Sequence, residues 1–403
     1  MSTEIKPGYK MTEIGVIPEE WDLVTAGQIG RFRGGNGFPL EFQGELTGTY
    51  PYFKVSDMNN VGNETMMHVA NNYISEITRK ALGAAIFAKN SIVFAKVGAA
   101  VFLERKRILA QPSCLDNNMS AFELDDKKAN YRYVHHRLLN IRLSDLVSTT
   151  ALPSLSGKVL SEIKFPLPPL EEQCAIATAL SDVDVLLTEI DRLIAKKRDI
   201  QQATMQQLLT GQRRLPGFSG EWEVKRIEDL ADCLDNLRIP LNESQRKEMQ
   251  GDYPYCGANG VLDYVNDYVI DDDIILMAED GGYFDEYIFR PIAYRMTGKC
   301  WVNNHAHILK AKTGCDQGFL FYSLVHKNIL SYLASGTRAK LNKSEMNKIE
   351  VHLPKEKVEQ TAIAAILSDM DAELAALETR RDKARQLKQG MMQELLTGRI
   401  RLV

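Results

Sequence analysis

The sequence is poor in cysteine, with six in 403 residues and no C-x-x-C pair. Such scattered cysteines exclude a disulfide framework and a zinc site built on paired thiols. His305 and His307 could share one face of a strand, but no third ligand follows at a recognisable spacing, so we expect no metal site. No signal peptide is recognisable either, and we therefore expect reduced thiols in a cytoplasmic protein.

A strong excess of either charge is also missing. Lys and Arg total 49 against 53 for Asp and Glu, giving a net charge of -4. This balance excludes a uniformly basic nucleic-acid coat, so any DNA-binding surface must be a local patch. The longest apolar stretch, residues 81–103, is interrupted by Lys89, Asn90 and Lys96, and no segment is predicted to span a membrane.

Catalytic motifs are absent as well. The sequence has no [Asp/Asn]-Pro-Pro-[Tyr/Phe] run of adenine methyltransferases, no Walker loop and no serine nucleophile elbow. The glycine-rich segment 32–37 lacks the context of a nucleotide-binding loop and is interpreted as a flexible turn. The acidic runs 271–273 and 279–280 lack the lysine of a nuclease core and are interpreted as solvated turns. We expect no catalytic centre.

The chain does contain a long internal repeat. The run EEQCAIATALSDVD at 171–184 returns as VEQTAIAAILSDMD at 358–371, and LLTG at 208–211 returns at 395–398. Weaker matches lie upstream, where Tyr-Pro-Tyr and Cys-x-x-Asn-Asn each occur once in both halves. Each half is thus a divergent domain followed by a better-preserved segment, and the whole chain is a tandem duplication.

The preserved segment is predicted to be a long helix. Apolar residues alternate at spacings of four and three, which is typical of a coiled-coil seam. Prolines mark the helix starts, and Gly211 and Gly398 are expected C-caps. About 40 residues at roughly 1.5 Å each give a helix of roughly 60 Å. The seam residues are Ile176, Leu180, Val183, Leu187, Ile190 and Ile194 in the first copy, and Ile363, Leu367, Met370, Leu374 and Leu377 in the second.

Connectivity then predicts the fold class. The second domain begins where the first helix ends, so the two helices must be antiparallel, and the tail 399–403 should end near the arm 9–21. We expect an α+β protein in which two strand-rich α/β domains form a pseudo-twofold tandem repeat, separated by an antiparallel coiled coil of two long helices. The expected divisions are residues 1–165, 166–215, 216–352 and 353–403.

Basic side chains on the predicted loops and strand ends are candidates for DNA contact, since long cations bind phosphates and Arg, Asn or Gln can read bases. For any single residue the alternative is a solvated charge. The first domain contributes Arg31, Arg33, Lys54, Lys96, Arg105, Lys106 and Arg107, and the second contributes Arg290, Arg295, Arg338, Lys340 and Lys343.

The repeat carries a family resemblance. IKFPLPPLEEQ-x-x-I-A (163–177), LSDVD and LLTGQRRLPGF in the first copy, with IEVHLP, EQTAIAAILSDMD and LLTGRIRL in the second, resemble the specificity (S) subunit of type I restriction-modification systems. Before the second helix, Ser335-Gly336-Thr337 followed by Leu341-Asn342-Lys343-Ser344 also resembles the family. The first copy departs from this pattern at residues 149–157, where Pro153 stands in place of Ala339.

This resemblance implies that each domain is a target recognition domain that reads one half of a bipartite double-stranded DNA target. The helices would set the spacer and dock two methyltransferase subunits, and restriction-translocase subunits would join for cleavage. S-adenosylmethionine, ATP and Mg would belong to those partners, with no cofactor in this chain. Two alternatives are a protein-interaction scaffold, and a self-sufficient methyltransferase or nuclease using the acids near Asp271 and Glu279.

Overall fold

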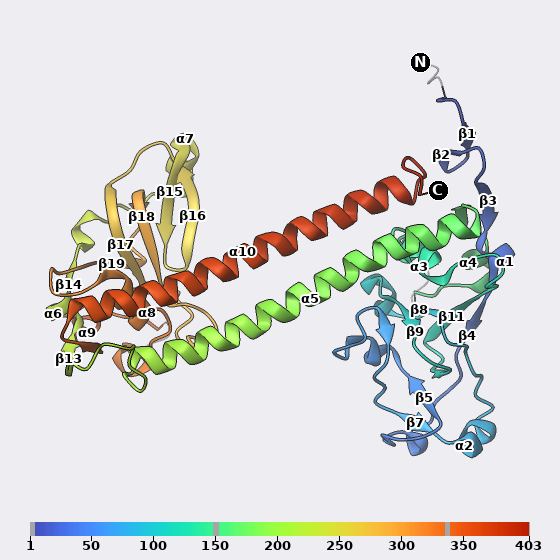
Figure 1. Cartoon of the computed structure of the whole chain (residues 1–403), viewed down its shortest axis with the longest axis horizontal. Helices are drawn as coiled ribbons and strands as arrows, with labels where there is room; N and C mark the ends of the chain where they lie inside the picture. The colour runs from blue at the N-terminus through green and yellow to red at the C-terminus, as the bar shows by residue number, and fades with distance from the viewer. Residues whose placement is uncertain (1–4, 148–152, 335–338, 403) are drawn as a thin grey trace. The chain divides into compact units, whose positions relative to one another are not determined.

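The computed structural model describes residues 5–147, 153–334 and 339–402. The chain forms two compact units: unit 1 comprises Met1–Glu189 with Arg381–Val403, and unit 2 comprises Ile190–Arg380. Each unit contains one globular domain, here domain 1 or domain 2, and parts of both long helices, α5 (Leu170–Leu209) and α10 (Lys357–Leu395) (Figure 1).

Domain 1 is built on a five-stranded sheet. Its strand order is β4 (Gly30–Gly34), β11 (Met119–Leu124), β8 (Ile92–Ala95), β9 (Lys106–Leu109) and β6 (Met66–Met67). Smaller sheets are formed by β10 (Cys114–Leu115), β5 (Tyr50–Phe53) and β7 (Tyr73–Ile74), by β1 (Tyr9–Thr12) and β2 (Gly15–Pro18), and by β3 (Asp22–Thr25) and β12 (Lys164–Leu167). The short helices are α1 (Ala26–Ile29), α2 (Glu76–Ala81), α3 (Tyr131–Leu139) and α4 (Gly157–Ser161).

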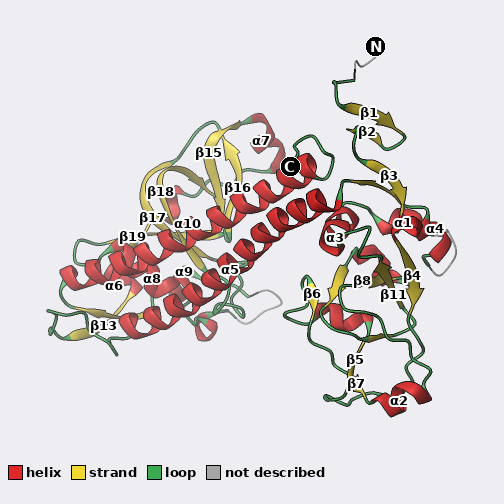
Figure 2. Cartoon of the chain, turned by 45° about the vertical axis from the view of Figure 1, so that its right-hand side comes forward, coloured by secondary structure: helices red, strands yellow, loops and turns green. Residues whose placement is uncertain are grey.

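Domain 2 repeats this plan on a six-stranded sheet. The order is β14 (Ala231–Cys233), β19 (Ala306–Ala311), β17 (Ile270–Ala278), β18 (Ala293–Val302), β15 (Gln250–Gly257) and β16 (Gly260–Val265). A separate pair is formed by β13 (Trp222–Arg226) and β20 (Glu350–Pro354). The helices are α6 (Ile227–Leu230), α7 (Glu243–Glu248), α8 (Gln317–Val325) and α9 (Lys343–Met346), and α8 lies against the sheet next to the first turns of α10 (Figure 2).

Two sequence interpretations are corrected here. The acids 271–273 lie within strand β17 and not in a solvated turn, because Lys310 and Arg295 on the two neighbouring strands pair with Asp272 and Asp273. The glycine-rich segment 32–37 is no flexible turn either, since it begins in β4 and continues as a β-bridge to Asp116. Gly35 is required there, because a Cβ would collide with the adjacent backbone.

The long helices begin and end as their sequences predict. α5 begins directly after Pro169 and α10 three residues after Pro354. Gly211 and Gly398 both follow the helices with φ of 72°, the left-handed conformation that favours glycine at a C-cap. Gly211 lies against the Trp222 ring and Gly398 against Trp21, so a side chain at either glycine would also disturb the packing of a tryptophan.

The helices are antiparallel within each unit. In unit 1, Lys388 of α10 contacts Asp184 of α5 at 2.5 Å, and in unit 2, Lys197 of α5 contacts Glu373 of α10 at 2.7 Å. The first two seam residues of each helix are buried in a domain core. These are Ile176 and Leu180 in unit 1, and Ile363 and Leu367 in unit 2. The remaining positions vary in burial: Ile190 and Ile194 are buried, Met370 packs against the core of unit 2, and Val183, Leu187, Leu374 and Leu377 are half-buried.

Each helix also closes the core at the far end of its own length. Leu208, near the end of α5, is buried in the core of unit 2, where α10 begins. Leu395 and Leu396, at the end of α10, are buried in the core of unit 1, where α5 begins. Each domain is therefore completed by the start of its own helix and by the end of the helix that follows the other domain.

A buried ion pair fixes each of these junctions. The Glu172 carboxylate in unit 1, with 0% of the side chain exposed, accepts hydrogen bonds from Arg401 at 2.6 and 2.9 Å and from the Trp21 indole at 2.9 Å. The Glu359 carboxylate in unit 2 accepts two from Arg214 at 2.6 and 2.7 Å. A buried carboxylate needs such partners, because its desolvation is otherwise uncompensated.

The polar residue after each buried glutamate completes the junction. Gln173 accepts from the backbone N–H of Asn130 at 2.8 Å, and Gln360 accepts from that of Asp316 at 2.8 Å. Asn130 and Asp316 are the N-caps of α3 and α8, so the Glu-Gln pair positions the start of the helix that covers each sheet. The expected meeting of tail and arm is also confirmed, since the Arg401 guanidinium donates to the Glu20 carboxylate at 2.9 Å.

The fold class is thus the α+β tandem repeat that the sequence predicts, with two mixed α/β domains and two long antiparallel helices. α3 and α8 are the corresponding helices of the two repeats, each beginning at a polar N-cap. Among the described residues, no helix is both long and apolar enough to cross a membrane.

Replacing Arg401 by alanine should destabilise unit 1 by about 3 kcal/mol, because it leaves the buried Glu172 carboxylate without its cation. Urea unfolding of the full chain measures the loss, and faster hydrogen exchange in residues 170–180 assigns it to unit 1. The matched control is Arg399→Ala, which removes an exposed arginine from the half-buried Glu394, and it should cost less than about 1 kcal/mol. Equal losses for the two variants would contradict this role of the ion pair.

Candidate nucleic-acid interface

The two domains share one structural frame at the end of a central strand. In domain 1, β8 ends at Ala95, and the next residue, Lys96, receives a hydrogen bond on its carbonyl oxygen from the Leu155 N–H at 2.9 Å. In domain 2, β17 ends at Ala278, and Glu279 receives the same bond from the Leu341 N–H at 2.7 Å. The segments 153–156 and 339–342, called lead-in segments below, run from this edge into α4 and α9.

Further contacts show that the frames are equivalent. Val97 forms a β-bridge with Ser154, as Asp280 does with Lys340. The N–H of Lys96 donates to Asn118 and that of Glu279 donates to His305, so the turn after the repeated Cys-x-x-Asn-Asn motif lies at the same edge in both domains. In each domain a strand end, a lead-in segment and an asparagine-rich turn therefore meet. The place where these three segments meet is called the frame edge below.

In domain 1, three of the predicted cations approach the frame edge. Lys96 lies over Gly34, where a Cβ would collide with its ammonium nitrogen. Lys54 follows β5 and donates to the Gln43 side chain at 2.8 Å, while the neighbouring strand β10 leads into the asparagine-rich turn. Arg105 begins the segment that enters β9 beside the end of β8, and it donates to Asn59.

The other cations of domain 1 have internal partners. Arg31 and Arg33 share Glu123 at 3.1 and 2.9 Å, on the strand pair β4–β11, and Arg33 also stacks on the Phe87 ring. Lys106 has 1% of its side chain exposed and binds Glu104 at 2.5 Å and the Ile141 carbonyl oxygen at 2.8 Å. Arg107 is half-buried, and burial together with Arg105 lowers its pKa. Lys106 thus serves the interior and is not accessible to a phosphate.

In domain 2 the frame edge holds a compact group of five charged side chains, called the ionic cluster below. Glu279 pairs with Arg238 and with Lys340, the latter at 3.0 Å. Asp235 pairs with Arg238 at 3.3 Å and with His307 at 2.7 Å, and His307 lies 3.8 Å from Glu279. The acidic run 279–280 is therefore no solvated turn, since Asp280 likewise contacts His305 at 2.6 Å.

His307 is a buried imidazolium. Its Nε2 lies 2.8 Å from the Leu341 carbonyl oxygen, which can only accept, and its Nδ1 faces the Asp235 carboxylate, so both nitrogens donate. Burial opposes charge on the ring, but the hydrogen bonds to Asp235, Cys233 and Leu341 outweigh it and raise the pKa of His307 to about 9. The same pairing lowers the pKa of Asp235 to about 2 despite burial.

Cys233, Asp235 and His307 also present three potential metal ligands within 4.8 Å of one another. The geometry favours an ion pair over a metal site. Two ligands of one tetrahedral Zn²⁺, each about 2.0–2.1 Å from the ion, lie well over 3 Å apart, whereas His307 and Asp235 are 2.7 Å apart.

The remaining predicted cations of domain 2 are dispersed. Arg295 binds Asp273 through two bonds of 2.7 and 2.6 Å and borders a hollow lined by residues of α8 and α10, away from the ionic cluster. Arg290 is exposed and stacks on Tyr283, with 3.1 Å from its guanidinium carbon to the ring centroid. Lys343 is exposed at the first residue of α9. Arg338 lies outside the described residues.

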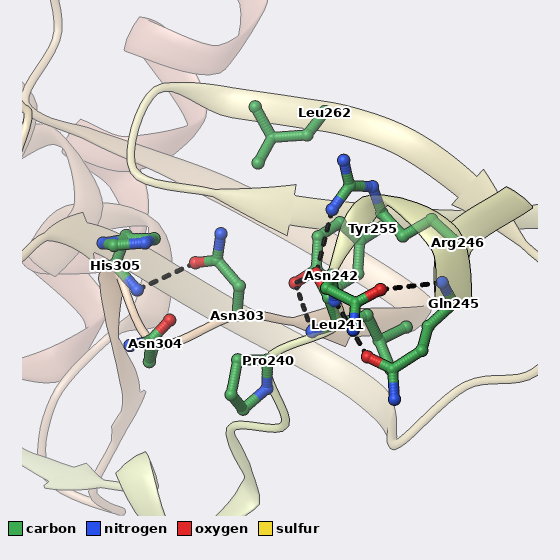
Figure 3. Close-up of a pocket in the computed structure, with 10 residues that line it drawn as sticks. All are labelled: Pro240, Leu241, Asn242, Gln245, Arg246, Tyr255, Leu262, Asn303, Asn304 and His305. Carbon is green, nitrogen blue, oxygen red and sulfur yellow. Dashed lines mark hydrogen bonds between the residues drawn. The ribbon is translucent and has the colours of Figure 1, made fainter.

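Sequence reasoning missed a polar pocket beside the ionic cluster. This cavity of about 480 Å³ lies between α7 with its preceding loop and the asparagine-rich turn (Figure 3). Leu262 and His305 also border it. The repeated Cys-x-x-Asn-Asn motif was the available signal. The other lining residues are Pro240, Leu241, Asn242, Gln245, Arg246, Tyr255, Asn303 and Asn304.

The pocket presents hydrogen-bond donors suited to DNA. Asn242 and Gln245 bond to each other's backbone N–H through their side-chain oxygens, at 2.9 Å each. Among the described residues their side-chain NH₂ groups have no partner, and neither has that of Asn303. Arg246 is held over the Tyr255 ring by Asp263. Amide and guanidinium groups of this kind can bind base edges or phosphate oxygens.

The acidic groups give no support to an independent catalytic centre. Asp272, Asp273 and Glu279 are each bound to a lysine or arginine, which leaves no free carboxylate pair for a magnesium ion in β17 or its end. Each domain carries its own copy of the frame, whose polar groups can bind phosphate oxygens or base edges.

Comparison with known proteins supplies the family. The family model described as "Type I restriction modification DNA specificity domain" matches residues 18–198 and 219–386. The chain belongs to this family, and as a specificity subunit it is the DNA-recognising, non-catalytic part of a restriction-modification complex.

Relatives support this membership. The MjaVIII type I restriction enzyme specificity subunit of Methanocaldococcus jannaschii is 25% identical over 96% of this chain and 94% of its own. A protein assigned as a specificity subunit in Haemophilus influenzae is 35% identical, over 40% of each chain. The crystal structure of the type I S subunit from M. genitalium has the same fold, with a TM-score of 0.67, 16% identity and coverage of 97% and 98%.

The stability of unit 2 should fall as the pH rises from 7 to 10. The pKa of His307 is about 6.5 in the unfolded chain and about 9 in the fold. Its protonation therefore stabilises the fold fully below about pH 6.5, and this stabilisation is lost as the pH rises through about 9. The expected loss is about 2–3 kcal/mol, measured by urea unfolding at each pH.

The variant His307→Gln removes the titrating group and should flatten this pH dependence, whereas His68→Gln, at an exposed site in domain 1, should leave it unchanged. If His307→Gln proves too unstable, Asp235→Asn provides the same test, because it removes the main partner of the imidazolium. If stability still fell as steeply between pH 7 and 10 in whichever of these two variants folds, His307 would not be charged.

Proposed function

We propose that domain 1 and domain 2 each read one half of a bipartite double-stranded DNA target, and that the two long helices set the number of unread base pairs between the halves. The observation that carries this proposal is the duplicated frame edge: one backbone arrangement bears Lys96 and Gly34 in domain 1, and Glu279 and Asp235 in domain 2. Equivalent positions with different side chains are suited to different half-sites.

The chemistry of the frame edges supports the same reading. Domain 2 offers amide donors from Asn242, Gln245 and Asn303 next to the ionic cluster. Domain 1 offers Lys54, Lys96 and Arg105 near its own frame edge. Cations and amides on loops are the side chains that bind phosphates and base edges in DNA complexes.

The proposed partners follow from the family and from the helices. Two methyltransferase subunits would dock along the helices and supply S-adenosylmethionine, and restriction-translocase subunits would supply ATP and Mg-dependent cleavage, all in the cytoplasm. No cofactor would belong to this chain. A structural neighbour with a TM-score of 0.51 comes from a study of complex assembly in a type I system, which supports assembly as the setting for this fold.

Exchange of domain 1 tests the division of labour. Residues 20–150 are replaced by those of a related subunit, and the hybrid is assembled with its methyltransferase subunits. Sequencing of methylated adenines should show one changed half-site, with the other half-site and the spacer unchanged. The reciprocal exchange of residues 221–334 is the matched control and should change the other half. A simultaneous change of both half-sites by either exchange would contradict the proposal.

Lengthening the helices tests the spacer. Seven residues are added after Glu189 in α5 and seven after Arg380 in α10, at the boundaries of the two units, so that the antiparallel pairs within each unit are kept. The addition lengthens each helix by roughly 10 Å, or about three base pairs of duplex. The methylated motif should gain about that number of unread base pairs, or methylation should cease because the domains face different grooves.

The control lengthens α5 alone, which puts the two helices out of register. This variant should lose methylation, because the pair of Lys197 with Glu373 in unit 2 and the pair of Lys388 with Asp184 in unit 1 can no longer form at the same time. An unchanged, fully methylated motif in the doubly lengthened protein would rule out the helices as the element that sets the spacer.

A further inference from the structure

The two frame edges place their cations at different positions. In domain 2 the cation is Lys340, on the lead-in segment, and the strand-end position is Glu279. In domain 1 the lead-in position is the neutral Ser154, and the strand-end position is Lys96. The lysine is therefore on the strand end in domain 1 and on the lead-in segment in domain 2, although the backbone arrangement is the same.

The two lysines also differ in whether they are neutralised. Lys340 lies 3.0 Å from Glu279, which in turn is bound by Arg238. Lys96 has no ion pair or side-chain hydrogen bond within the described parts of the chain. It is half-buried, so its charge is held close to the frame.

The local sequence of domain 1 maintains this arrangement. Gly34 stands where domain 2 has Asp235, and the Lys96 ammonium occupies the space that a side chain at residue 34 would need. The region that contains the ionic cluster in domain 2 is thus reduced to one lysine above a glycine. An unpaired ammonium fixed over exposed backbone can bind a phosphate oxygen without first breaking an ion pair.

We propose that Lys96 is a phosphate-contacting residue of domain 1, whereas Lys340 is held by Glu279 and positions the lead-in segment of domain 2. This inference rests on the proposed DNA-binding function and adds an asymmetry to it. The half-site of domain 1 is anchored by an additional phosphate contact, and domain 2 relies more on the donors of its pocket. The two lysines should therefore contribute unequally to the salt dependence of DNA binding.

The test measures DNA affinity of the assembled complex, this chain with its methyltransferase subunits, at several salt concentrations. The probes are a duplex with the methylated target and a duplex of unrelated sequence. Lys96→Gln should lower the slope of log affinity against log salt by roughly one unit. It should weaken binding to both duplexes alike, because a phosphate contact carries no sequence information.

Three variants serve as controls. Lys96→Arg keeps the charge and should keep the slope. Lys89→Gln removes an exposed lysine just before β8, at the opposite end of that strand, and should leave the slope unchanged. Lys340→Gln should change the slope by less than about half a unit, because its charge is already paired.

Each outcome decides a separate question. Absence of DNA binding by the unaltered complex would refute the proposed function. Normal binding with an unchanged slope for Lys96→Gln would refute only the phosphate contact. A change in the ratio of target to unrelated affinity would make Lys96 a base-reading residue, and reduced assembly with the methyltransferase subunits would make it a protein contact. Either result would overturn the inference.

Discussion

The buried glutamate at the start of each long helix is the constraint on which the rest of the structure depends. Glu172 and Glu359 lose all but about one per cent of their exposure and must find cations inside the protein. Those cations, Arg401 and Arg214, come from the segment that ends the other helix. These buried ion pairs thus join each domain to the end of the helix that follows the other domain, and the antiparallel arrangement follows from them.

Much of this architecture was predictable because the duplication preserves it. The spacing of apolar residues gives the helices, and the shared Glu-Gln and Leu-Leu-Thr-Gly runs mark their two ends. The junction itself was not predictable, because nothing in the sequence shows that Arg214 and Glu359, 145 residues apart, would meet. Likewise the acids of β17 resemble a turn until their cross-strand partners Arg295 and Lys310 are known.

The candidate interface was harder to predict from the sequence, because the sequence does not show whether a basic residue faces solvent or pairs with a buried acid. Lys106 and Lys96 illustrate this: the first is enclosed with Glu104, while the second stands unpaired above Gly34. The net charge of -4 has a matching explanation. Many cations neutralise acids within the fold, so a few unpaired groups at the frame edges can meet DNA without a basic surface.

The exchange of helix ends also determines the order in which the protein can be completed during synthesis. Unit 2 needs only residues 190–380, whereas unit 1 requires the last segment, with Leu395, Leu396 and Arg401. The domain that leaves the ribosome first is therefore the last to close its core. Until α10 and the residues after it have been made, the apolar sites for α10 on domain 1 stay open, and a stop before Leu395 leaves the earlier-made half unfinished.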